Sequence, residues 1–379
     1  MSVKARTYLF TAFEPSGDAH AAPVIATLRT LDPGARIVAF GGERMAAAGA
    51  QLIERTAADG TMGVPALSRV RAIHAIAQRV DAWAAANRLS VHIPVDSPAA
   101  NFPMCARTKR RGAKIVHLVA PQMWAWGPWR IRKLRRLTHH VLCLLPFEEA
   151  WFRERGVPAT FIGHPVLNTH DEDAAASHSR TAAPEGTPKV LLLPGSRTKE
   201  VDANALLLLD AWEAIAREHS AARGLVCFAS SIVRERFMSL AGRRLTNGLT
   251  EVSGCIRPAA SWCDMAVAVS GTVSLDLTRA RKPMIGVYRT GPVAARVGRL
   301  LLRAPHRLLP NILAGKRIVP EFVPWSGSSK PILETACRMA RDPTWRSEIT
   351  QSLEAVNRQF DGHDPGCEAA RIIVDAASS

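Results

Sequence analysis

Residues 190–197 read VLLLPGSR, and this stretch decides the fold class because it joins a buried strand to the start of a helix. The apolar run before Pro194 predicts a strand that is covered on both faces. A Leu/Ala/Trp pattern follows the turn and predicts a helix to about Glu218. The turn collects backbone N–H groups, the Ser196 hydroxyl and the Arg197 guanidinium, which suit a diphosphate. A plain strand-to-helix turn, with Ser196 as N-cap and Arg197 in solvent, is the structural alternative.

A second apolar run, residues 265–269, ends in a hydroxyl-rich turn of the same kind. This turn consists of Ser270, Gly271 and Thr272 and precedes a predicted helix. Because parallel strands end at the same edge of a sheet, both turns are predicted to bind one phosphate-bearing ligand. Asp276 follows one helical turn after Thr272. It suits either a ribose hydroxyl or a helix-capping role, and the sequence does not choose between them.

Strand and helix patterns alternate along the whole chain. Strands are predicted at residues 7–12, 36–40, 89–95, 114–119, 141–145 and 160–162, and again at 189–193, 224–229, 265–269 and 283–288. Residues 171–188 are polar, lack apolar periodicity and are predicted to form a linker. The expected fold is therefore α/β, with two doubly wound Rossmann-like domains, 1–170 and 189–350, facing across a cleft. Residues 351–379 are expected to be helical, with the first domain as their candidate packing partner.

The bulk composition narrows the class of partner. The 379 residues carry 49 basic and 33 acidic side chains, a net charge of +16, which indicates a phosphorylated substrate, an anionic membrane surface or nucleic acid. The chain contains no recognisable nucleic-acid module, so no nucleic acid is expected. It contains no apolar run of ~18 residues and no secretory pattern at its start, so a cytoplasmic location is expected. Seven cysteines without a CxxC pair predict reduced thiols rather than disulfides or a zinc site.

Two turns of the first domain carry candidate catalytic groups. Residues 13–18 read FEPSGD and place Glu14, Ser16 and Asp18 between a strand and a helix, where they could contact substrate or cap the helix. Asp96 follows the strand that ends at residue 95. A carboxylate at the carboxyl end of a strand could take a proton from an attacking hydroxyl. A turn-capping role for Asp96 before Ser-Pro is the alternative.

A cluster of aromatic and basic residues follows the strand at 114–119. Such a cluster suits a surface that faces acyl chains or a membrane, because indole rings settle among headgroups and cations meet lipid phosphates. Packing of the tryptophans in the core beside a solvated basic face is the alternative. The residues concerned are Trp124, Trp126, Trp129, Arg130 and Arg132.

Several short motifs occur in one order over nearly the whole chain. They are EPSGD at 14–18, the Asp96 loop, PQMWAW at 121–126, LLPFE at 144–148, GHP at 163–165, LPGSR at 193–197, SGT at 270–272 and LPNILAG at 309–315. Together they resemble the lipid-A-disaccharide synthase family.

The resemblance implies a two-domain, inverting glycosyltransferase of the GT-B type that needs no metal or other cofactor. Its reaction joins UDP-2,3-diacylglucosamine to 2,3-diacylglucosamine 1-phosphate (lipid X) and releases UDP. By motif, Asp96 matches the family's candidate general base, Ser196 and Arg197 its diphosphate turn, and Asn311 and Glu321 its nucleotide-side segment. The family also implies peripheral attachment to the inner face of the cytoplasmic membrane and a possible homodimer.

This chain departs from the family pattern in the Asp96 loop. The family's Asp-Ala-Pro-Asp-Phe-Asn reads DSPAAN at residues 96–101, so the second acid is replaced by Ala99. The acid in the helix after Ser-Gly-Thr is also shorter here, as Asp276 instead of Glu. Two alternatives therefore stay open: another sugar-nucleotide enzyme of the same architecture, and a relative that binds UDP-sugar or lipid without turnover.

Overall fold

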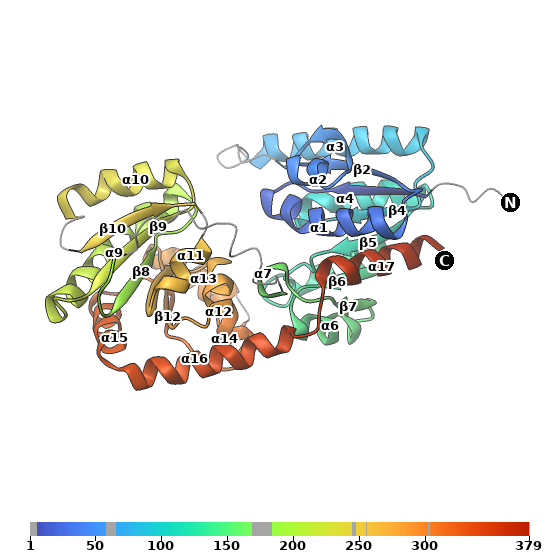
Figure 1. Ribbon diagram of the computed structural model, residues 1–379. Coiled ribbons are helices and arrows are strands. Elements are labelled where there is room, and N and C mark those ends of the chain that lie inside the picture. Colours follow the sequence, from blue (N-terminus) through green and yellow to red (C-terminus); the bar gives the residue numbers. More distant parts are fainter. Residues whose placement is uncertain are drawn as a thin grey trace. The chain divides into compact units, whose positions relative to one another are not determined.

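The computed structural model describes residues 6–57, 66–168, 184–244, 248–254, 256–301 and 304–378. The chain divides into two compact units (Figure 1). Unit 1 comprises Met1–Asn168 and Gly362–Ser379, and unit 2 comprises Thr169–Asp361. Each unit is built on one sheet in which every strand pair is parallel.

The sheet of unit 1 has seven strands in the order β3-β2-β1-β4-β5-β6-β7. Its central strands are almost continuously apolar because helices cover both faces. The strands are β1 (Thr7–Thr11), β2 (Arg36–Gly41), β3 (Gln51–Arg55), β4 (Val91–Pro94), β5 (Lys114–Leu118), β6 (His140–Cys143) and β7 (Ala159–Phe161).

Alternate residues of β1 pack into two different hydrophobic cores. Tyr8 and Phe10 are fully buried on one face, whereas Leu9 is fully buried on the other, as the two-residue period of a strand requires. The helices and helical turns of unit 1 are α1 (Pro15–Leu31), α2 (Glu43–Ala47), α3 (Ala66–Ala86), α4 (Pro98–Arg110), η1 (Pro128–Arg130), α5 (Ile131–Leu137), α6 (Pro146–Arg153), α7 (Pro165–Asn168) and α17 (Pro365–Ser378).

The last helix, α17, belongs to unit 1 although it follows unit 2 in the sequence. It lies beside α1 (Figure 1), and its residues Ala369, Ala370 and Ile373 are fully buried in the same core as Ile25 of α1. The division between the units falls at Gly362, so α16 (Pro343–Asn357) stays with unit 2. The segment predicted at 351–379 therefore begins inside one helix of unit 2 and ends in a helix of unit 1.

The sheet of unit 2 has six strands in the order β10-β9-β8-β11-β12-β13. They are β8 (Lys189–Leu193), β9 (Arg223–Phe228), β10 (Leu249–Ser253), β11 (Met265–Val269), β12 (Met284–Arg289) and β13 (Glu321–Trp325). The helices are α9 (Thr198–Glu218), α10 (Ser231–Ala241), α11 (Ile256–Trp262), α12 (Val273–Arg279), α13 (Pro292–Leu301), α14 (Leu309–Ala314), α15 (Lys330–Arg341) and α16, with helical turns η2 (Gly242–Arg244) and η3 (Arg358–Phe360).

The α/β class with two doubly wound units is confirmed, and ten predicted strands form within a few residues of their expected bounds. Three strands were missed, and all three are edge strands: β3, β10 and β13. An edge strand that is half-buried alternates polar and apolar side chains and does not stand out as an apolar run. Of the predicted linker 171–188, only residues 184–188 lie within the described residues.

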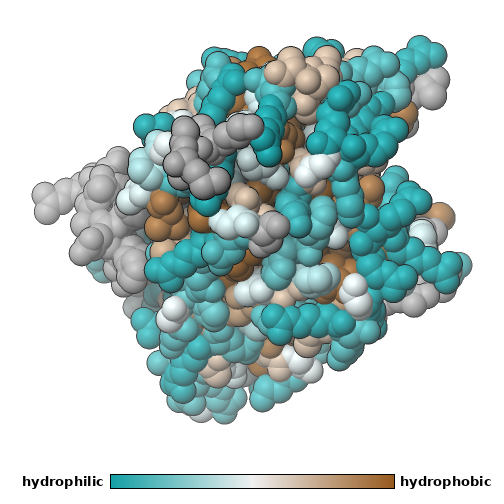
Figure 2. Space-filling view, turned by 90° about the vertical axis from the view of Figure 1, so that its right-hand side faces the viewer, coloured by the Kyte–Doolittle hydropathy of each residue, from teal (hydrophilic) through white to brown (hydrophobic). Residues whose placement is uncertain are grey.

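The surface and the cysteines fit the composition. Hydrophilic side chains cover most of the face in Figure 2, with apolar residues in separate patches. Six cysteines lie in described segments; all six are free thiols and five of them are buried. Within the described ranges, no helix is both long and apolar enough to cross a bilayer. The same ranges contain no group of three His, Cys, Asp or Glu side chains that could hold a metal ion.

Candidate functional site

The predicted polar turns lie where the strand order of each sheet reverses. In unit 1 this switch falls between β1 and β4, and the turns after these strands carry Glu14 and Asp96. In unit 2 it falls between β8 and β11, followed by Arg197 and Thr272. The carboxyl ends of strands at such a switch point are the usual binding crevice of an open α/β sheet. The turns Ser196–Arg197 and Ser270–Thr272 thus follow neighbouring strands, and their predicted binding of one ligand stays a prediction.

The backbone at Asp96 has an unusual conformation. The described residues include four non-glycine residues with positive φ, and three of them follow β4 or β5: Asp96 (49°), Ser97 (36°) and Val119 (67°). Such conformations disfavour L-residues, and a β-branched residue such as Val119 most of all. The strain is held in place because the Asp96 N–H donates to the Leu118 carbonyl (2.9 Å), which ties the two strand ends together. Strain of this kind gathers at functional sites.

The Asp96 carboxylate is partly buried and faces a second acid. Burial raises its pKa, the negative charge of Glu14 adds to the rise, and the N–H of Ser97 opposes it. Glu14 in turn accepts a hydrogen bond from the Ser97 hydroxyl (3.1 Å). A carboxylate with a raised pKa and some solvent access is a better proton acceptor than an ordinary surface aspartate.

A buried amide supports this loop from below. Asn101, which is fully buried, donates through Nδ2 to the carbonyls of Val95 (3.1 Å) and Asp96 (2.9 Å). Its Oδ1 accepts from the Thr11 hydroxyl (2.6 Å), so the turns after β1 and β4 share one hydrogen-bond network. We name Glu14, Asp96, Ser97 and Asn101 the Asp96 site. Sequence reasoning missed Asn101 as a positioning residue, although it lies within the quoted loop.

The other two candidates of the first turn differ from each other. Ser16 is exposed at the start of α1. Asp18 is buried, and its two carboxylate oxygens accept the backbone N–H groups of Arg44 and Met45, both at 3.0 Å. Asp18 therefore caps α2 rather than its own helix, and its predicted contact with substrate stays a prediction.

The turn after β8 is shaped around a buried acid. Gly195 has φ +102°, and a Cβ there would lie 2.6 Å from Oε2 of Glu200. Glu200 accepts the Ser196 N–H (3.0 Å) and pairs with the Arg197 guanidinium (3.2 Å). The Ser196 and Arg197 side chains remain exposed, so both could still meet a ligand. Only glycine allows this close approach, which explains the glycine in this turn.

The turn after β11 leaves its polar groups accessible. Gly271 and Thr272 are exposed, and Ser270 is half-buried. Burial raises the pKa of the Asp276 carboxyl, while the positive charges of Arg257 and Arg279 oppose that rise. Arg257, at the start of α11, is therefore a cation that acts on Asp276, and the sequence patterns did not single it out.

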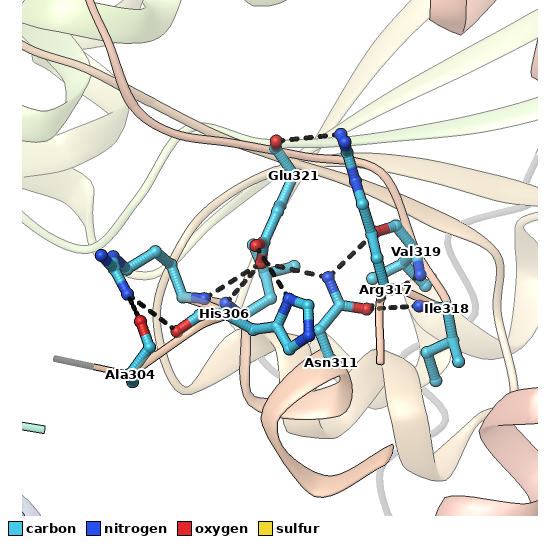
Figure 3. Close-up of polar contacts among 9 residues, drawn as sticks. Ala304, His306, Asn311, Arg317, Ile318, Val319 and Glu321 are labelled. Carbon is cyan, nitrogen blue, oxygen red and sulfur yellow. Dashed lines mark hydrogen bonds and ion pairs between the residues drawn. The ribbon is translucent and has the colours of Figure 1, made fainter. Parts of the chain in front are cut away.

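Asn311 and Glu321 build a loop (Figure 3). Asn311 is fully buried; it donates to the Val319 carbonyl (2.9 Å) and to Glu321 (3.0 Å), and accepts the N–H groups of Ile318 and Val319. Oε2 of Glu321 also accepts the N–H groups of Arg307 (3.1 Å) and Leu308 (2.9 Å) just before α14. Both side chains hold the chain in shape, and their predicted contact with nucleotide stays a prediction.

The three tryptophans do not share one role. Trp124 is half-buried, and its Nε1 donates to the buried carboxylate of Glu148 (2.9 Å). Trp126 and Trp129 are 49% and 70% exposed, and the Arg130 guanidinium stacks 3.9 Å from the Trp126 ring centroid. An outward, lipid-facing position thus fits Trp126 and Trp129 together with the exposed Arg132, whereas Trp124 points inward.

Two doubly wound units, each with polar turns at its switch point, define the class of two-domain α/β proteins with Rossmann-like domains. A solved structure of a putative UDP-N-acetylglucosamine 2-epimerase from Listeria monocytogenes shares this fold (TM-score 0.66, 12% identity, 99% of this chain and 96% of that one). So does the glycotransferase of kitacinnamycin (TM-score 0.65, 14% identity, 98% and 99%). At these identities the likeness shows the fold alone.

Sequence comparison establishes the family. The family described as lipid-A-disaccharide synthetase matches residues 8–358. The lipid-A-disaccharide synthase of Thiobacillus denitrificans is 33% identical over 357 residues, which cover 92% of this chain and 94% of the relative. The chain belongs to the lipid-A-disaccharide synthetase family, a family of glycosyltransferases in lipid A biosynthesis.

Proposed function

We propose that this chain condenses UDP-2,3-diacylglucosamine with 2,3-diacylglucosamine 1-phosphate (lipid X) to form the β-1,6-linked disaccharide 1-phosphate and UDP. The observation that carries the proposal is the family match over residues 8–358. Its support in the structure is that Glu14 and Asp96 lie at the switch point of unit 1, and Arg197 and Thr272 at the switch point of unit 2.

In the proposed mechanism, Asp96 takes the proton from the 6-hydroxyl of the acceptor as that oxygen attacks the anomeric carbon of the donor sugar. The bond from that carbon to the UDP oxygen breaks, and UDP leaves with the electron pair. An inverting displacement needs one such base together with stabilisation of the leaving diphosphate. Glu14 and Ser16 are the further candidates beside Asp96 for contact with the acceptor.

The leaving diphosphate is assigned to unit 2. The exposed Arg197 and the Ser270–Thr272 turn supply a cation and hydroxyl groups, and the N-terminus of α9 adds its partial positive charge. We propose that these groups act without a metal ion. Undiminished turnover in excess EDTA is the expected result, and activity restored by Mg²⁺ after chelation would contradict it.

The decisive test is mass spectrometry of the products from UDP-2,3-diacylglucosamine and lipid X. Wild-type protein is expected to release disaccharide and UDP together. Asp96→Ala is expected to lose turnover by at least a hundredfold while it still binds UDP, because a general base typically contributes ~10²–10⁴-fold. Turnover like wild type in this variant would remove the base assignment.

Arg197→Ala tests the proposed diphosphate site in unit 2. It should weaken UDP binding, since a cation beside a diphosphate is lost, and it should leave the fold intact because the side chain is exposed. Titration calorimetry with UDP measures this directly. Unchanged UDP affinity would take Arg197 out of the diphosphate site.

The same assay distinguishes the proposed function from two others. The fold is shared with a putative UDP-N-acetylglucosamine 2-epimerase, so epimerised sugar nucleotide without disaccharide would favour that class. Binding of UDP without any product in folded protein would favour a relative that has lost turnover with the acid at Ala99.

We propose that the protein attaches peripherally to the inner face of the cytoplasmic membrane through the exposed Trp126 and Trp129 and their neighbouring arginines. Indoles and cations adjacent on one surface suit an anionic interface, and the net charge of +16 adds attraction. Co-flotation with anionic but not neutral vesicles, reduced in the double variant Trp126→Ala/Trp129→Ala, is expected. We also propose a homodimer, which light scattering after size-exclusion chromatography would test.

A further inference from the structure

Glu148 is a buried acid next to the Asp96 site. It lies in the first turn of α6 and is only 2% exposed. Its Oε1 accepts the Trp124 indole N–H (2.9 Å), and its Oε2 accepts the Leu145 backbone N–H (3.1 Å). Both oxygens therefore have donors from different segments, one after β5 and one after β6. The side chain thereby joins two strand ends of unit 1.

The same carboxyl responds to Asp96. Burial, with a smaller contribution from the negative charge of Asp96, raises the pKa of Glu148 to about 7 against the hydrogen bonds from Trp124 and the backbone, which lower it. An ordinary glutamate is fully ionised at neutral pH. The raised pKa places the proton exchange of Glu148 near neutral pH.

Trp124 connects this acid to the strand that supports Asp96. The indole packs edge-on against Phe147, with ring centroids 4.9 Å apart and an interplanar angle of 85°. Trp124 follows six residues after Leu118, whose carbonyl accepts the Asp96 N–H. The ring is thus fixed by one hydrogen bond and one aromatic contact at the edge where β5 ends.

We propose that Glu148 is a positioning residue of the Asp96 site, which holds the Trp124 indole in place and, through its charge, controls how tightly Asp96 holds its proton. This inference rests on the proposed role of Asp96 as the base. When Glu148 is ionised, its negative charge favours the protonated form of Asp96, so Asp96 accepts the acceptor's proton more readily. Glu148 itself transfers no proton to substrate.

The other ionisable groups around Glu148 can be named element by element. On β6, the Cys143 thiol has a pKa that is raised by burial and then by the charges of Glu148 and Glu149, so it stays neutral. On α6, Glu149 pairs with Arg153 (2.8 Å) and also accepts the Phe161 N–H. Beyond Asp96 lies Glu14 at the start of α1. Among these groups, Asp96 is the one whose charge raises the pKa of Glu148.

The test follows the Trp124 indole N–H by ¹⁵N–¹H NMR of the full-length protein labelled at its nine tryptophans. The Trp124 signal is the one missing from Trp124→Phe. In wild type this signal is expected to shift with a midpoint near pH 7, where its acceptor Glu148 titrates. In Glu148→Gln it is expected to lose that titration, and in Asp96→Asn the midpoint is expected to move to lower pH, because a negative neighbour has been removed.

Glu149→Gln is the matched control, since it removes the adjacent acid on α6 and should leave the Trp124 midpoint within error. A Trp124 signal that does not titrate between pH 5.5 and 8.5, or an Asp96→Asn midpoint equal to wild type, would overturn the inference. If Glu148→Gln does not fold, Glu148→Asp restores a carboxylate and must restore the titration. These results need no turnover, so they separate a failure of this inference from a failure of the proposed function.

Activity gives a second readout. The pH profile of kcat for disaccharide formation is expected to show an inflection near pH 7 that Glu148→Gln lacks and Glu148→Asp retains. The KM for lipid X should change less than kcat in Glu148→Gln, because Glu148 acts through Asp96. Equal loss in the Asp and Gln variants would indicate a purely structural role and would contradict the proposal.

Discussion

At the scale of single residues, two buried histidines on neighbouring strands differ in one respect that matters for stability. His92 and His117 are both fully buried. His92 has hydrogen bonds to the hydroxyls of Thr11 (2.8 Å) and Thr108 (2.9 Å). Both ring nitrogens of His117 lack a partner among the described residues. An unpaired buried polar atom costs free energy, whereas a paired one does not.

His117→Leu should therefore raise the free energy of unfolding by about 1–2 kcal/mol, since an unpaired polar ring is exchanged for an apolar side chain. His92→Leu should lower it, because two hydroxyls lose their partner. Urea unfolding of both variants measures the contrast. A loss of stability in His117→Leu equal to that in His92→Leu would show that a buried water satisfies His117.

At the scale of elements, the loop before β13 depends on one carboxylate. Oε2 of Glu321 accepts three N–H groups, those of Arg307, Leu308 and Asn311. Glu321→Ala should destabilise unit 2 by about 1–3 kcal/mol, because these donors lose their common acceptor. Glu321→Gln should cost less than ~1 kcal/mol, since its carbonyl oxygen can take the Oε2 position while its amide faces His306, which lies 3.5 Å from Oε1.

Thermal unfolding of the three proteins, read together with UDP affinity, distinguishes structure from binding. If Glu321 only shapes the loop, Glu321→Gln keeps both stability and affinity. A variant with wild-type stability that no longer binds UDP would instead support the predicted nucleotide contact.

The same elements show how far sequence reasoning reached. Strands such as β8 and β11 are buried on both faces, so their apolar runs were found with correct bounds. The pairing of their polar turns followed from sheet geometry. The sequence could not reveal the direction of individual side chains. Asp18 caps α2, the Asn311 amide binds the backbone, and the Trp124 indole points inward to Glu148. Each depends on partners 7 to 27 positions away, which no local pattern encodes.

At the scale of the whole molecule, buried histidines are distributed unevenly. Among the residues that the structure describes, the histidines with a strongly lowered pKa all lie in unit 1: burial lowers the pKa of His20 to about 4 and those of His92, His117 and His164 to about 3. An unfolded chain takes up these protons near pH 6.5. Below that pH the unfolded state binds more protons than the native state, so stability falls as the pH falls toward 3–4.

One carboxyl of unit 1 acts in the opposite direction. The pKa of Glu148 is about 7 in the native state, whereas that of a glutamate in the unfolded chain is about 4.3. Between these two pH values the native state holds a proton on Glu148 that the unfolded chain does not hold. Stability from this group therefore rises as the pH falls through that range. Burial also raises the pKa of Asp96 in unit 1 and of Asp276 in unit 2, so each unit has at least one such group. In unit 1, four histidines with a lowered pKa thus oppose two acids with a raised one.

Unit 1 should accordingly unfold before unit 2 on acidification from pH 7 to 5. Hydrogen exchange read by mass spectrometry, corrected for intrinsic rates, is expected to show protection lost first in peptides of β1, β4 and β5, while β8 and β11 stay protected. The helix α17 should lose protection together with β1, because Ile373 is buried in the core of unit 1. His117→Leu should reduce the acid sensitivity, since one of the four protonation sites is gone. Simultaneous loss of protection in both units, or earlier loss in unit 2, would mean that the two units unfold cooperatively or that other groups govern the acid response.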